Sequence, residues 1–141
     1  MLNSSNQAIT AQISYLGNLR TEATHVKSGS KIITDAPTDN HGKGEAFSPT
    51  DLVATAYVSC LLTVVGIHCA NNAINYTHGE GTVVKIMGDN PRKIDRLEIE
   101  IDFSGNNWEV KTQERLERVA LACPVANTLD EYVDVNINFK Y

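Results

Sequence analysis

The amino-acid sequence predicts an α+β fold in a single domain of residues 1–141. Two observations favour this class: apolar and polar residues alternate in several short segments, and other segments have helical periodicity or helix-capping residues. The expected order is β-β-β-α-β-β-α-α-β, so strands and helices do not alternate regularly. A chain of 141 residues, 42% of them hydrophobic, is long enough for one apolar core.

The N-terminal part is expected to form three strands. Their predicted positions are Ala8–Leu16, Leu19–Val26 and Lys31–Thr34. Gly17-Asn18 predicts the first turn and Ser28-Gly29-Ser30 the second. The segment Asp35–Phe47 is rich in glycine, proline and asparagine, so we expect a loop there.

A long helix is predicted from Pro49 to about Asn71. Ser48 suits the N-cap, Pro49 suits the first helical position, and Asp51 completes a capping box. The following residues are apolar on nearly all faces, so the helix should lie buried in the middle of the fold. No charged residue occurs between Asp51 and Glu80, but polar residues interrupt the stretch, which favours a helix of a soluble protein over a membrane span.

The C-terminal part is expected to contain three strands and two helices. The strands are predicted at Gly81–Met87, Ile94–Phe103 and Val133–Phe139, and the helices at Lys111–Ala122 and Pro124–Leu129. Pro124 ends the first of these helices and can begin the second, with Cys123 as the flanking cap residue.

Composition excludes several classes of function. The net charge is −5 and no run of Lys or Arg forms a basic stripe, which argues against nucleic-acid binding. The segment Met1–Thr10 lacks the basic region and apolar run of a secretory signal, so we expect a cytoplasmic protein that does not bind membranes. No flavin or nucleotide motif occurs, so no cofactor is expected.

The three cysteines differ in setting. Cys60 is expected in the middle of the apolar helix, where a structural role is the simpler interpretation. Cys69, nine residues later, faces the opposite side, at a rotation of about 180° and a rise of roughly 13.5 Å, so it cannot pair with Cys60. Cys123 is predicted at a helix start, where unpaired N–H groups would lower the thiol pKa, but tight packing explains it equally well. The cysteines and the loop residues His41 and His78 lack the spacing of a metal site.

Two segments together resemble the OsmC/Ohr family. They are FSPTDLVATAYVSCL, with Pro49 eleven residues before Cys60, and ALACPVANTL, with Cys123 directly before Pro124. The resemblance implies an intertwined homodimer that reduces organic or other hydroperoxides. It further implies that Cys60 is oxidised to a sulfenic acid, that Cys123 resolves it as a disulfide, and that a dithiol, for example a lipoyl group, is the reductant.

The resemblance also implies an arginine from the N-terminal strands that stabilises the thiolate, and Arg20 matches best. One departure from the family pattern concerns the residue after Pro49, which is Thr50 instead of the Glu of the hydroperoxide-resistance branch. The candidate supporting acids are Glu45, in the loop, and Asp51, which the capping box explains more simply.

Two other functions remain open. The first is a dimeric scaffold that binds a small hydrophobic ligand and has unreactive cysteines. The second is a thiol transferase whose substrate is not a peroxide. Thiols that resist modification until the protein unfolds would favour the scaffold, and turnover with peroxide and a dithiol would exclude the transferase.

Overall fold

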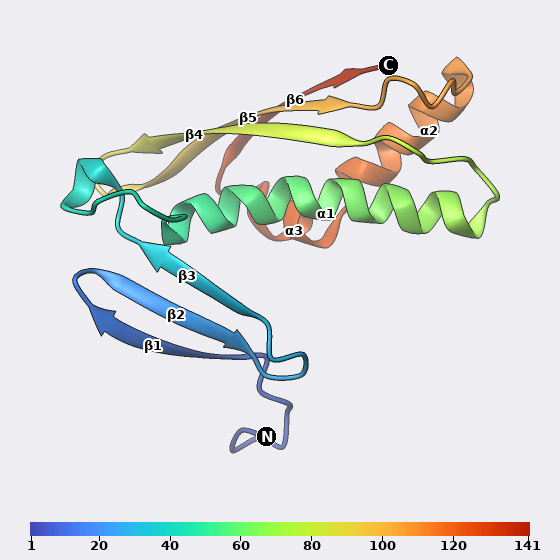
Figure 1. The fold of residues 1–141 in the computed structure, drawn as a ribbon. Coiled ribbons are helices and arrows are strands. Elements are labelled where there is room, and N and C mark those ends of the chain that lie inside the picture. The colour runs from blue at the N-terminus through green and yellow to red at the C-terminus, as the bar shows by residue number, and fades with distance from the viewer. The chain divides into compact units, whose positions relative to one another are not determined.

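The computed structural model describes residues 1–141 and confirms the α+β class and the predicted order of strands and helices (Figure 1). The chain divides into two compact units, Met1–Leu52 and Val53–Tyr141. Each unit contains one three-stranded sheet. That residues 1–141 form a single domain remains a prediction, since the chain divides into these two units.

The N-terminal unit is an antiparallel sheet of order β1-β2-β3 followed by a loop. Its elements are β1 (Ala11–Gly17), β2 (Arg20–His25), β3 (Lys31–Asp35) and the 3-10 helix η1 (Thr38–Asn40). The predicted turn follows Gly17, whose φ of +86° suits glycine. The register pairs Arg20 with Asp35 across β2 and β3, which places both side chains on one face of the sheet.

The C-terminal unit combines a mixed sheet with three helices. Its elements are α1 (Pro49–Asn71, whose first turn belongs to the N-terminal unit), β4 (Glu80–Gly88), β5 (Lys93–Asp102), α2 (Val110–Leu121), α3 (Pro124–Leu129) and β6 (Asp134–Lys140). The strand order is β4-β5-β6, in which β4 and β5 are antiparallel and β5 and β6 are parallel. The helices lie on one side of this sheet (Figure 1).

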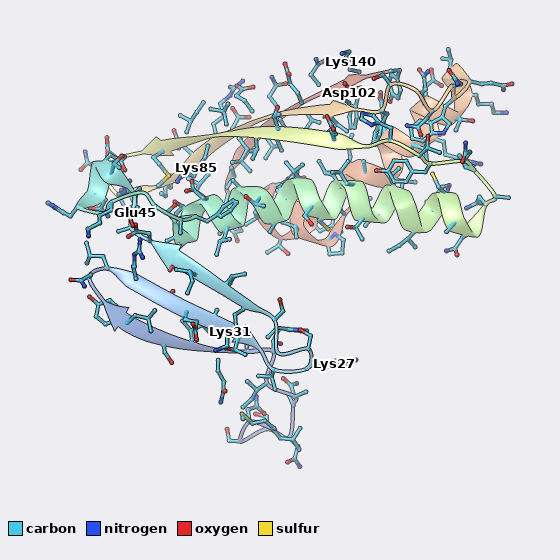
Figure 2. All side chains as sticks on the ribbon, viewed as in Figure 1. Lys27, Lys31, Glu45, Lys85, Asp102 and Lys140 are labelled. Carbon is cyan, nitrogen blue, oxygen red and sulfur yellow. The ribbon has the colours of Figure 1, made fainter.

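The core of the C-terminal unit forms between β5 and the helices. Leu97, Ile99 and Ile101 alternate along β5 and are at most 2% exposed, as the period-two pattern predicts. They cluster with buried residues of α1, α2 and α3. The opposite face of the sheet carries the polar residues of β5 and β6 together with the exposed Val84 and Ile86 of β4. Its end carries an ion pair between Lys140 Nζ and Asp102 Oδ2 at 3.5 Å (Figure 2).

The start of α1 confirms the predicted capping box. The Ser48 N–H donates to Asp51 Oδ2 at 2.9 Å, and the Asp51 N–H donates to Ser48 Oγ at 3.0 Å. These two bonds satisfy main-chain groups that a helix terminus otherwise leaves unpaired. Asp51 therefore has the capping role that the sequence favoured.

By length and composition alone, α1 could cross a membrane, with a mean hydropathy of 1.9 in its most apolar window. A single such helix is weak evidence, because the core helices of soluble proteins have the same properties. The helix buries one face, which includes Tyr57, Leu61 and Val65, against the C-terminal core. Val53 and Ile67 on the helix remain exposed.

Candidate functional site

Two of the predicted site residues, Cys60 and Cys123, face each other in the C-terminal unit. Cys60 lies in the middle of α1 and is partly exposed, whereas Cys123 is the N-cap of α3 and is completely buried. The Cys60 side chain is within hydrogen-bonding reach of the Cys123 thiol. Both are free thiols. A partly exposed cysteine and an enclosed one thus lie side by side.

Of the two alternatives left open for Cys123, the structure favours tight packing over a thiol pKa lowered by the α3 N-terminus. Burial is the largest influence and raises this pKa, and the neighbouring Cys60 raises it further. The Ala126 N–H donates to Cys123 Sγ at 3.3 Å, and this bond and the Val125 N–H oppose the rise without reversing it. Burial outweighs the two hydrogen bonds at the start of this short helix. Cys123 is therefore protonated at neutral pH.

Tyr57, one turn before Cys60 on α1, is a buried neighbour of this pair that sequence reasoning missed. Its O–H donates to Asp130 Oδ1 at 2.7 Å. Burial raises the phenol pKa most, followed by the Asp130 carboxylate and then by negative charge on Cys123 or Cys60. Asp130 is the C-cap of α3, 73 residues away in sequence. No local pattern indicates such a pairing.

A shallow apolar groove of about 300 Å³ lies between α1 and α3, near the two cysteines in sequence. It is lined by Val53, Ala56, Pro124, Val125, Thr128 and Leu129. Val53 and Ala56 precede Cys60 by seven and four residues, which places them on the same side of α1. The groove therefore begins one helical turn from Cys60, which does not itself line it.

Arg20 and Glu45, both named from the sequence, lie together in the N-terminal unit. The Arg20 guanidinium Nη2 contacts Glu45 Oε2 at 2.5 Å and Asp35 Oδ2 at 3.5 Å. Figure 2 shows Glu45 in the segment between β3 and α1. Arg20 is thus held between two carboxylates, of which Glu45 is exposed and Asp35 is 1% exposed.

Asp35 is the organising acid of this cluster, and the sequence analysis did not identify it. The Glu45 N–H donates to Asp35 Oδ2 at 3.0 Å. This hydrogen bond and the Arg20 charge lower the Asp35 pKa, against the opposing effect of burial. Only the register of β2 and β3, which pairs Arg20 with Asp35, could have revealed it.

The remaining candidates lie elsewhere. Asp51 closes the capping box of α1, and the Thr50 hydroxyl lies 3.2 Å from that of Ser48. Cys69 is a buried core residue, as predicted, and burial raises its thiol pKa, although Arg115 partly opposes this rise. These positions explain the start of α1 and part of the core.

Comparisons with known proteins agree with this architecture. The family model described as OsmC-like protein matches residues 42–138. A solved structure from Psychrobacter arcticus, of a protein assigned to the osmotic stress and detoxification response, is 41% identical, with a TM-score of 0.88 over 94% of this chain and 96% of that one. No protein of curated function matches the chain.

Two more distant structures share the fold. The organic hydroperoxide resistance protein OsmC of Legionella pneumophila is 20% identical, with a TM-score of 0.71 over 93% of this chain and 95% of that one. The organic hydroperoxide resistance protein OhrB of Bacillus subtilis is 19% identical, with a TM-score of 0.66 over 94% and 98%. Both likenesses extend over nearly the entire chain and therefore over both units.

Proposed function

This chain belongs to the OsmC family, and from that premise we propose that it is a thiol-dependent peroxidase that reduces organic hydroperoxides through Cys60 and Cys123. The observation that carries the proposal is the thiol pair in the C-terminal unit, in which the partly exposed Cys60 adjoins the enclosed Cys123. This arrangement suits a reaction in which one sulfur meets the substrate and the other reacts only with its neighbour.

In the first step, the Cys60 thiolate attacks one oxygen of the hydroperoxide. An S–O bond forms as the O–O bond breaks, so the sulfur is oxidised to a sulfenic acid and the peroxide is reduced to an alcohol, which takes up a proton. The apolar groove one helical turn from Cys60 would receive the organic part of the substrate. An alkyl or lipid hydroperoxide fits that lining better than a sugar or nucleotide would.

In the second step, the Cys123 sulfur attacks the Cys60 sulfenic acid. An S–S bond forms, the S–O bond breaks, and the hydroxyl group leaves as water with the Cys123 proton. The raised pKa of Cys123 suits this role, because a protonated, enclosed thiol does not compete with Cys60 for peroxide. A dithiol of the lipoyl type would then reduce the disulfide through a mixed disulfide at Cys60, the more exposed of the two cysteines.

Arg20 is proposed to favour the Cys60 thiolate through its permanent charge. This role comes from the family resemblance, and the paired carboxylates of Asp35 and Glu45 support it because they orient the guanidinium. We also propose a cytoplasmic location, because three free thiols suit a reducing compartment.

We propose that the chain acts as a homodimer. Ile13 and Ile32 lie on one face of the N-terminal sheet and are 63% and 49% exposed, and Ile67 of α1 is 56% exposed. A second copy of the chain would cover these side chains. Ile32→Glu should yield monomers in sedimentation experiments, whereas Lys31→Glu, its neighbour on the opposite face, should not. A wild-type chain that sediments as a monomer at micromolar concentration would contradict the dimer.

Steady-state peroxidase assays with cumene hydroperoxide and a dithiol test the proposed reaction. Cys60→Ser should abolish turnover, because the hydroxyl group is not a nucleophile of comparable strength. Cys123→Ser should react once with peroxide and then accumulate the Cys60 sulfenic acid. Cys69→Ser is the matched control and should retain wild-type turnover. Full activity of Cys60→Ser would refute the proposal.

A further inference from the structure

The short helix α3 joins the resolving cysteine to Asp130. Cys123 caps the beginning of its six residues, and Asp130 is the C-cap. Within the helix, the Asn127 N–H donates to the Cys123 carbonyl at 3.0 Å and the Asp130 N–H donates to the Ala126 carbonyl at 2.9 Å. Because these bonds make α3 a rigid segment, the position of its C-terminal end determines how Cys123 is presented to α1.

That C-terminal end is attached to α1 by one directional bond. Tyr57 is 1% exposed, and its O–H donates to Asp130 Oδ1 at 2.7 Å. A hydrogen bond to a charged acceptor is about twice as strong as a neutral one. Because the raised phenol pKa keeps Tyr57 protonated, and because thiolate charge at Cys60 or Cys123 raises it further, the donor persists in every charge state of the thiol pair.

The two ends of α3 therefore meet α1 at two places, the thiol pair and the Tyr57–Asp130 bond. Disulfide formation has strict geometric requirements, since the sulfurs must approach to about 2.05 Å with the Cα atoms about 4.4–6.8 Å apart. Apolar packing between α1 and α3 is not directional and cannot by itself fix that geometry. A hydrogen bond with defined length and angle can.

We infer that Tyr57 and Asp130 are positioning residues for the thiol pair, whose hydrogen bond holds α3 so that Cys123 can attack oxidised Cys60. This inference rests on the proposed function, because it assumes that Cys60 is oxidised to a sulfenic acid. It concerns the second step only, because Tyr57 acts through α3 and not on the peroxide. Tyr57→Phe should therefore separate the two steps.

Tyr57→Phe is also a gentle substitution. The phenyl ring fills the same buried space, and the exposed Asp130 carboxylate can replace the lost donor with water. Tyr76→Phe is the matched control, because the Tyr76 hydroxyl donates to the Leu62 carbonyl at 3.4 Å and has no part in α3. Thermal unfolding of both variants should show folded proteins.

The first experiment is a single turnover with cumene hydroperoxide. In Tyr57→Phe, trapping of the Cys60 sulfenic acid with dimedone should occur at a rate within about twofold of wild type, whereas disulfide formation should slow by about tenfold, the factor expected for a hydrogen bond to a charged group. Asp130→Ala should match Tyr57→Phe, and Asp130→Asn should recover most of the rate because its amide oxygen still accepts. The double variant Tyr57→Phe with Asp130→Ala should be no slower than either single variant.

The second experiment does not depend on peroxide. Equilibration of the reduced protein with glutathione buffers gives the equilibrium constant of the Cys60–Cys123 disulfide, and Tyr57→Phe should lower it by about tenfold, equivalent to about 30 mV. If the wild-type protein does not react with peroxide but forms the Cys60–Cys123 disulfide in glutathione buffers, the peroxidase proposal is refuted. The positioning role of Tyr57 and Asp130 is then tested by the disulfide equilibrium constant alone. The inference is overturned if Tyr57→Phe has the wild-type constant, if Tyr76→Phe has an equal effect, or if no Cys60–Cys123 disulfide forms with either oxidant.

Discussion

In the N-terminal unit the residues most shielded from solvent are polar, whereas in the C-terminal unit they are almost all apolar. The first group consists of Thr34, Asp35 and Ser48. The second includes every buried apolar residue of the chain, among them Cys123 of the thiol pair. Hydrogen bonds and ion pairs therefore organise the buried residues of the N-terminal unit, whereas burial of apolar surface stabilises the C-terminal unit.

This difference affects the charge states of the candidate site residues in the two units. In the N-terminal unit, buried carboxylate and main-chain groups orient a permanent positive charge on Arg20. In the C-terminal unit, the apolar surroundings keep Cys123 protonated while Cys60 stays partly exposed. In the proposed peroxidase reaction the two kinds of surroundings have different roles, since charge favours a thiolate and burial protects the resolving thiol. Four substitutions test this difference between the two units.

Leu97→Ala should cause the largest change, a loss of about 2–5 kcal/mol in the free energy of unfolding. Leu97 is fully buried in the C-terminal core, so the substitution leaves a cavity there. Urea denaturation followed by circular dichroism measures the loss. Tyr132→Ala, at a residue that is 72% exposed, is the control and should change stability by less than about 0.5 kcal/mol. Equal effects at the two positions would mean that the C-terminal unit does not depend on its apolar core.

Arg20→Met should lower kcat/KM for cumene hydroperoxide by about a hundredfold, the typical consequence of removing one group that stabilises charge at a reactive centre. Arg20→Lys, which keeps the charge but not the planar guanidinium, should lose less. A control at the exposed Arg118 of α2, Arg118→Met, should leave turnover unchanged. If Arg20→Met has the same kcat/KM as the wild type, Arg20 has no role in the reaction.

Ser48→Ala should cost about 1 kcal/mol of stability, because it removes the side-chain acceptor for the Asp51 N–H at the start of α1. The comparison is Ser59→Ala, an exposed position within the same helix, where alanine is at least as favourable. Thermal unfolding measures both. If Ser59→Ala were the more destabilising change, the capping box would not be what stabilises the start of this helix.

Asp35→Asn should alter the pH dependence of stability. The folded-state pKa of Asp35 lies below its ordinary value of 3.8, so its stabilising contribution is fully present above about pH 4 and is lost as pH falls through the folded pKa. The wild type should therefore lose more stability than Asp35→Asn as the pH falls below about 4. Urea midpoints across this range are the measurement, with Asp89→Asn in the β4–β5 turn as control. Parallel wild-type and Asp35→Asn curves would contradict the role of Asp35 as the organising acid.

Much of the fold follows from local sequence patterns. The capping box at Ser48 and Asp51, the alternation along β5 and the Pro124 start of α3 each depend on neighbouring residues, so each was predictable. The first strand was placed three residues too early, because Ala8 pairs in an isolated bridge with Leu2 instead of continuing β1.

The site was less predictable because its contacts join distant segments. Asp35 reaches Arg20 only through the β2–β3 register, and Tyr57 reaches Asp130 only after α1 and α3 have packed together. The pKa of Cys123 is raised because the residue is completely buried, and no sequence motif indicates complete burial. The family resemblance therefore named the two cysteines and Arg20, whereas Asp35, Tyr57 and Asp130 were found only in the structure.

The proposed reaction can be tested by titration of the reduced protein with cumene hydroperoxide, with thiol counting and disulfide mapping by peptide mass spectrometry. We expect that one equivalent of peroxide consumes two of the three thiols and that the disulfide joins Cys60 to Cys123, with Cys69 unchanged. Survival of all three thiols in the folded protein, or a disulfide that includes Cys69, would contradict the proposed reaction.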